Sequence, residues 1–157
     1  MSIKILLYDW EEDPRSGYFR GFFSSEMHMI INIGSKQITI EVSTSHSTIL
    51  IEIAAGLVEM FKNNEGYSFD VLGFGTTYNY IFTSKNDKIK IDAFDLMYDK
   101  VDESILYDKM KFARDYVHAL KSYLKWAESI NPRIKVDETF KLIEQYMNNL
   151  ENVIAEK

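Results

Sequence analysis

The chain contains no cysteine, and this absence excludes a large group of chemistries. Without thiols there is no disulfide, no thiolate nucleophile and no sulfur ligand for zinc or an iron–sulfur cluster. Glycine and proline are also scarce, with seven and two residues. The one glycine pair, Gly73-Phe74-Gly75, is followed by threonines and a tyrosine-rich stretch, not by the lysine and helix start of a phosphate loop. We interpret it as a bend between strands.

The sequence also lacks a long apolar run. The longest apolar-rich stretch, Ile49–Phe61, is interrupted by Glu52 and Glu59 and falls short of the roughly 18 residues that a membrane span needs. The first residues show no basic start followed by an apolar region and a small-residue cleavage site. We therefore expect a cytoplasmic protein that does not enter a membrane.

Positive charge is in deficit, because 18 Lys and Arg residues stand against 24 Asp and Glu residues and give a net charge of −6. This balance argues against nucleic-acid binding, whose affinity comes from neutralising phosphates. It favours a basic protein as a partner. The sequence carries no indication of the oligomeric state.

Catalytic and metal-binding patterns are absent as well. The three histidines, His28, His46 and His118, share no metal-ligand spacing. Ser45 and Ser47 flank His46, so a serine nucleophile remains an alternative, but no G-x-S-x-G occurs and helix capping is the favoured interpretation. We expect no enzyme activity.

A group of acids precedes the longest helical pattern and offers oxygen ligands: Asp92, Asp95, Asp99, Asp102 and Glu103. Its spacing fits no calcium loop, so we interpret these acids as flanking a strand end and the positive end of a helix dipole. A magnesium or calcium site is the alternative. We expect no metal and no cofactor.

What the sequence does contain is one dominant amphipathic pattern, Val101–Asn131, with Asp102 as its predicted N-cap and Pro132 marking its end. One apolar seam alternates spacings of four and three: Leu106, Met110, Ala113, Val117, Leu120, Leu124 and Ala127. A second seam lies about a hundred degrees around the helix: Ile105, Phe112, Tyr116, Ala119, Tyr123, Trp126 and Ile130. This helix should cover a sheet and also contact another helix.

The remaining patterns predict strands around one buried helix and a last helix. The period-two and turn signals place strands at Ser2–Trp10, Gln37–Ser43, Ser68–Phe74, Thr76–Ser84 and Lys88–Phe94. The stretches Tyr18–Phe23 and Met27–Ile33 form either two further strands or one bulged strand. Helices are predicted at Ile49–Asn63 and, capped by Asp137, at Glu138–Ala155. We predict a single α+β domain over residues 1–157, with a mainly antiparallel sheet of five to six strands, one buried helix and a C-terminal antiparallel helical hairpin.

Two surfaces stand out as binding candidates. The first is acidic and aromatic, because aromatic anchors surrounded by charge concentrate binding energy in interfaces: Tyr8, Asp9, Trp10, Glu11, Glu12, Asp13 and Tyr18. The alternative is that Trp10 and Tyr18 cap the core edge. The second is a basic ridge on the polar side of the long helix, which is either a binding ridge or a solvated face: Lys111, Arg114, His118, Lys121 and Lys125.

The succession of the stretch Gly17–Ile33, the return strand Gln37–Ser43, the helix Ile49–Asn63 and a second strand group resembles the layout of small bacterial toxin-immunity proteins. The resemblance covers roughly the first hundred residues and no motif. It implies a non-enzymatic inhibitor, and an acidic chain is suited to masking a basic toxin. The alternative is a small-ligand-binding domain with an aromatic pocket lined by Tyr78, Tyr80, Phe82 and Phe112.

Overall fold

The computed structural model describes residues 2–8, 19–63 and 66–157. Its first sheet contains β1 (Ser2–Tyr8), β2 (Glu26–Ile33) and β3 (Lys36–Val42), which are antiparallel and lie in that order. Alternate residues are buried from Met27 to Ile31 in β2 and from Ile38 to Val42 in β3, while the residues between them are at least partly exposed. The period-two pattern of the sequence therefore gives a sheet with one face on the core.

The second sheet contains β4 (Ser68–Leu72), β5 (Tyr78–Lys85), β6 (Lys88–Asp95) and β7 (Lys100–Asp108), again antiparallel and in chain order. Asn86 has a positive φ of 56° in the two-residue turn between β5 and β6, a conformation that asparagine tolerates.

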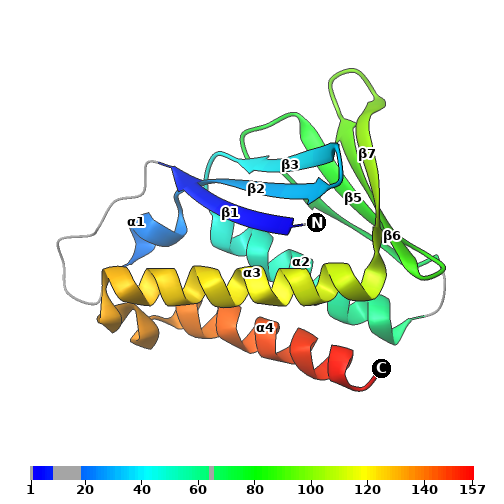
Figure 1. Cartoon of the computed structure of the whole chain (residues 1–157). Coiled ribbons are helices and arrows are strands. Elements are labelled where there is room, and N and C mark those ends of the chain that lie inside the picture. The colour runs from blue at the N-terminus through cyan, green and yellow to red at the C-terminus, as the bar shows by residue number, and fades with distance from the viewer. Residues whose placement is uncertain (1, 9–18, 64–65) are drawn as a thin grey trace.

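Three long helices lie on one side of the two sheets (Figure 1): α2 (His46–Lys62), α3 (Lys109–Ile130) and α4 (Glu138–Ala155). A short helix, α1 (Arg20–Phe23), precedes β2, and a 3₁₀ helix, η1 (Pro132–Val136), joins α3 to α4. A single hydrophobic core unites buried residues from both sheets and all of these helices.

Several predicted elements are confirmed. The buried helix follows the third strand, at α2. The acid group, by contrast, is not beside a helix start as expected, because Asp92 and Asp95 lie within β6 and Asp102 and Glu103 lie within β7. The last helix has the predicted bounds, and the side chain of Asp137 accepts hydrogen bonds from the N–H groups of Thr139 and Phe140. The α+β class and the antiparallel pairing are also as predicted.

The predicted single sheet of five to six strands is wrong, because the strands form two sheets of three and four. The reason lies at the edge of β3. There the N–H of Glu41 donates to the Tyr80 hydroxyl (3.1 Å) and the N–H of Ser43 donates to the Phe74 carbonyl (2.8 Å), so a side chain and a loop occupy positions that a fourth strand would take.

The start of the long helix is also corrected. Residues 100–108 form β7, in which Ile105 and Tyr107 are buried and Leu106 is exposed, so the true N-cap is Asp108, which accepts from the N–H of Lys111 (2.8 Å). Asp102 therefore caps no helix.

Two further details differ from the expectation. The stretch Tyr18–Phe23 does not form a strand within its described part, because α1 begins at Arg20. The helical hairpin is less simple than predicted: η1 replaces a plain loop between α3 and α4, and α4 packs against α2 as well as α3. Among the helices of the described residues, none is long and apolar enough to cross a membrane.

Candidate functional site: an acidic cleft between the sheets

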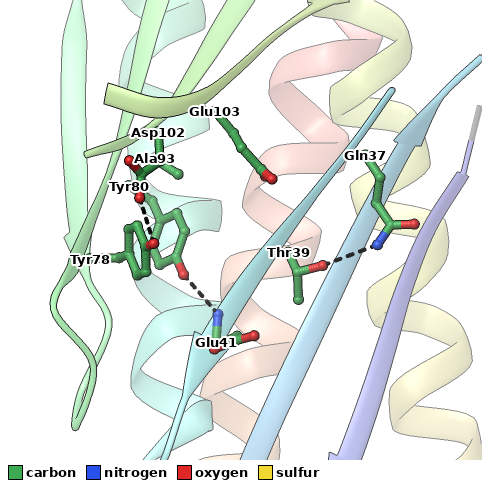
Figure 2. Close-up of a pocket in the computed structure, with 8 residues that line it drawn as sticks. All are labelled: Gln37, Thr39, Glu41, Tyr78, Tyr80, Ala93, Asp102 and Glu103. Atoms are coloured by element: carbon green, nitrogen blue, oxygen red, sulfur yellow. Dashed lines mark hydrogen bonds between the residues drawn. The ribbon is translucent and has the colours of Figure 1, made fainter. Parts of the chain in front are cut away.

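A cleft of about 550 Å³ opens between β3 of the first sheet and the inner face of the second sheet. Figure 2 shows Tyr78 and Tyr80 on the β5 side of this cleft and Glu103 extending from β7 into the space between the sheets. We call this hollow the acidic cleft. Its lining comes from four strands: Gln37, Thr39 and Glu41 on β3, Tyr78 and Tyr80 on β5, Ala93 on β6, and Asp102 and Glu103 on β7.

A β-bulge brings two consecutive acids of β7 to the cleft. Ala93 pairs with Glu103 and the next residue of β6, Phe94, pairs with Val101, so Asp102 is an extra residue in β7. In a regular strand, neighbouring side chains point to opposite faces, whereas a bulge re-aims one of them. This irregularity explains why both Asp102 and Glu103 line the same hollow.

The two tyrosines are held by hydrogen bonds across the cleft. The Tyr78 hydroxyl donates to Oδ2 of Asp102 (2.6 Å), and this bond, more than any other cause, raises the pKa of Tyr78 to about 12. The Tyr80 hydroxyl accepts from the Glu41 N–H, and burial raises the pKa of Tyr80. Both phenols are therefore neutral at pH 7, and the charge of the cleft comes from its carboxylates.

Three carboxylates line the cleft, on Glu41, Asp102 and Glu103, and no Lys, Arg or His is among the described residues of its lining. The ammonium of Lys100 lies 3.6 Å from Asp102, but it is 63% exposed and lies at the rim, where solvent screens the pair. The cleft thus carries a net negative charge inside a half-enclosed space, where low-dielectric walls strengthen the field.

A second hollow, of about 360 Å³, adjoins the first and shares Glu41 and Tyr78 with it. Glu26 and His28 on β2 extend this hollow over the outer face of the first sheet. The His28 ring packs against the ring of Tyr8, with the two centroids 4.6 Å apart. The acidic and aromatic surface therefore continues from the cleft to the end of β1.

An apolar loop connects the end of β6 to the start of β7, next to the bulge. Its apolar side chains are exposed, most of all those of Met97 (67%) and Tyr98 (69%), followed by Leu96, and the nearby Val101 of β7 is exposed as well. Oδ1 of the buried Asp95 accepts from the N–H groups of Met97 and Tyr98, which holds the turn in shape. We call residues 96–99 the apolar loop.

The interface predicted from the sequence can be followed only in part. Tyr8 is 39% exposed, on the same face of the first sheet as His28 and Glu41. The other predicted residues lie outside the described part of the chain: Asp9, Trp10, Glu11, Glu12, Asp13 and Tyr18. Their role stays a prediction.

The four residues of the predicted aromatic pocket lie in two different places. Tyr78 and Tyr80 line the acidic cleft, whereas Phe82 and Phe112 are fully buried and pack on one another in the core, with centroids 6.2 Å apart. They therefore form no common pocket.

His46, with its flanking serines, belongs to the core and not to a catalytic site. Its Nδ1 donates to the Ser25 carbonyl (3.0 Å), its Nε2 accepts from the Tyr123 hydroxyl (2.7 Å), and the ring is fully buried. Ser45 occupies the N-cap position of α2, but its side chain makes no capping hydrogen bond.

The structure does not gather the acid group into one site, and it pairs part of the basic ridge with acids. Asp92 and Asp95 are buried in β6 while Asp102 and Glu103 face the cleft, and no group of three or more metal-ligating side chains occurs in the described ranges. On the ridge, Lys111 pairs with Asp115 and Lys121 with Glu151. These pairs favour the solvated-face interpretation of the ridge.

The sequence reasoning missed Glu41 and the apolar loop. Glu41 is a single acid in an alternating strand, and the cleft residues of the second sheet lie more than 35 residues away from it along the chain. The apolar loop did carry a signal, since Leu96-Met97-Tyr98 stands between two strand-forming stretches. Comparison of the chain with protein-family models, with curated proteins and with solved structures found no match.

Proposed function

We propose that this protein is a non-enzymatic binding module that holds a basic protein partner in the acidic cleft. The observation that carries the proposal is the gathering of Glu41, Asp102 and Glu103 from two different sheets around one open cleft. A cleft lined by one sign of charge attracts an oppositely charged partner and speeds its association.

The apolar loop supplies the large side chains from which an interface gains affinity beyond its charges. Interfaces draw most of their affinity from a few aromatic and other large side chains, with charged residues around them. Met97 and Tyr98 are such side chains, and the Asp95 bonds order their backbone before a partner arrives. Binding then costs less conformational entropy than the ordering of a free loop would.

A basic toxin is one partner that fits this surface, and the chain would then be the immunity protein that masks it. The support for this narrower proposal is the resemblance in layout together with the acidic cleft. The proposed interface extends over the outer face of the first sheet to Tyr8, which precedes the acidic stretch Asp9–Asp13 in the sequence.

Binding of a small cationic ligand is the second candidate, since the volume of the cleft lies within the range of about 300–1,000 Å³ that is usual for ligand sites. Such sites are mostly lined by apolar side chains, whereas seven of the eight residues that line this cleft, all except Ala93, carry a charge, an amide or a hydroxyl group. The lining therefore favours the protein partner.

The test uses the basic protein that co-purifies with the native chain. We expect Glu103→Lys to slow association by roughly tenfold at low salt and to reduce the dependence of the on-rate on salt. The matched control is Glu144→Lys, the same charge change at an exposed position of α4, away from both sheets. We expect Tyr98→Ala to act mainly on the off-rate and to cost about 2 kcal/mol.

Surface binding kinetics at two salt concentrations separate these effects. If Glu103→Lys and Glu144→Lys slow association equally, only the net charge matters and the cleft is not the interface. If neither Glu103→Lys nor Tyr98→Ala changes the kinetics, the proposed function is wrong.

A further inference from the structure

The edge of β3 is built so that alternate residues direct their backbone groups away from β2. Ile33 and Lys36 flank the two-residue turn Gly34-Ser35 and pair with each other, so the residues of β3 with even numbers bond to β2. The residues of β3 with odd numbers direct their backbone N–H and C=O groups away from β2, toward the second sheet. The N–H of Glu41 follows this rule, since it donates to Tyr80 on the second sheet.

Half of this edge is hydrogen-bonded to the second sheet and half is not. Glu41 and Ser43 bond to Tyr80 and Phe74 of the second sheet. Gln37 and Thr39 lie further along the same edge and line the acidic cleft, and within the described residues no backbone hydrogen bond reaches them from outside the first sheet. Their N–H and C=O groups therefore face the hollow.

We propose that the partner inserts an extended basic segment into the acidic cleft, where it pairs antiparallel with β3 at Gln37 and Thr39. This inference rests on the proposed function and deepens it by naming the form of the ligand. Strand addition at an open edge takes its affinity from main-chain hydrogen bonds and its specificity from alternate side chains.

The face of β3 selects the side chains of the added strand. Gln37, Thr39 and Glu41 direct their side chains into the cleft, and residues directly opposite one another in an antiparallel pair share a face. The residues of the segment that bond to Thr39 and Gln37 therefore point their side chains toward Glu41, Asp102 and Glu103. Lys or Arg at every second position fits this charge.

The experiment uses a ten-residue peptide of alternating Lys and Thr and two of its N-methylated forms. One form carries the methyl groups on the Lys amides, which face β3 in this pairing, and the other carries them on the Thr amides, which face away. N-methylation removes the same number of donors in both forms, so each is the control for the other.

We expect the peptide methylated at Lys amides to lose about tenfold or more in affinity, as the loss of at least two backbone hydrogen bonds implies. The peptide methylated at Thr amides should bind within about twofold of the parent, measured by titration calorimetry. The substitution Glu103→Gln in the protein should weaken its binding of the parent peptide. Equal affinities of the two methylated forms, or no binding of the parent peptide, would overturn the inference.

Failure of the inference is distinguishable from failure of the proposed function. If the co-purified partner still depends on Glu103 while the two methylated peptides bind alike, the cleft is an interface but strand pairing is wrong. If neither the partner nor the peptide depends on Glu103, both are wrong.

Discussion

At the scale of single residues, His46 is a tightly constrained side chain outside the cleft. It is fully buried among Phe22 and Tyr123, and its two ring nitrogens are both used, one as donor to Ser25 and one as acceptor from Tyr123. This arrangement is that of the neutral ring, which burial favours over the charged one. Burial lowers the pKa of His46 from 6.5 to about 4, although its bond to the Ser25 carbonyl acts in the opposite direction.

This shift predicts a pH-dependent loss of stability. The unfolded chain takes up a proton on His46 near pH 6.5, whereas the folded chain resists it down to about pH 4, so acid favours unfolding between these values. We expect His46 to contribute a decrease of roughly 3 kcal/mol in the free energy of unfolding over this window. Above pH 6.5 its contribution is constant.

Urea unfolding at pH 7, 5.5 and 4.5 measures this contribution when the parent is compared with His46→Gln. The variant should be less stable at pH 7 and should lose less stability on acidification than the parent. Identical pH slopes for the two proteins would mean that His46 titrates alike in the folded and unfolded chains.

At the scale of elements, α3 shows that the phase of a helix is readable from its sequence. Leu120 is 1% exposed, while its neighbour Lys121 is exposed and paired with Glu151 on α4. We expect Leu120→Ala to lower the free energy of unfolding by roughly 2–5 kcal/mol, because it leaves a cavity in the core. Lys121→Ala should cost no more than about 1 kcal/mol, since an exposed ion pair contributes little.

Denaturant unfolding of the two variants against the parent tests the orientation of α3. Similar midpoints for Leu120→Ala and Lys121→Ala would contradict the packing of this helix on the sheets.

The start of α3 shows where periodicity fails. Ile105 and Leu106 continue the apolar seams of the helix backward, yet Ile105 and Tyr107 also alternate with Leu106 and Asp108 as a strand does. A pattern of a few residues fits both periods. Pairing with β6 decides the outcome, because it places Ile105 opposite Ile91 and Tyr107 opposite Ile89 in the core.

At the scale of the whole molecule, the two sheets share one core. Phe82 of the second sheet packs on Phe112 of α3, and the hydrogen bond from Glu41 to Tyr80 joins the sheets directly. We therefore expect one cooperative unfolding transition, with tryptophan fluorescence and far-UV circular dichroism giving the same midpoint in urea. Separate midpoints would show that one sheet unfolds independently.

The sequence by itself determined the local elements. Apolar periodicity located α2, most of α3 and α4, the Asp137 cap marked the start of α4, and alternation located β3 and β6. These features depend on residues within a few positions of one another, which share a helix face, a strand face or a cap.

Only the tertiary structure decided how the strands are divided and where the acids meet. Glu41 lies 61 residues before Asp102 in the numbering, and the two share a cleft because Tyr80 closes the edge of β3 and a bulge turns Asp102 inward. Both are non-local effects, since the neighbour of a strand edge is selected by packing across the whole core. No local pattern in the sequence specifies that neighbour.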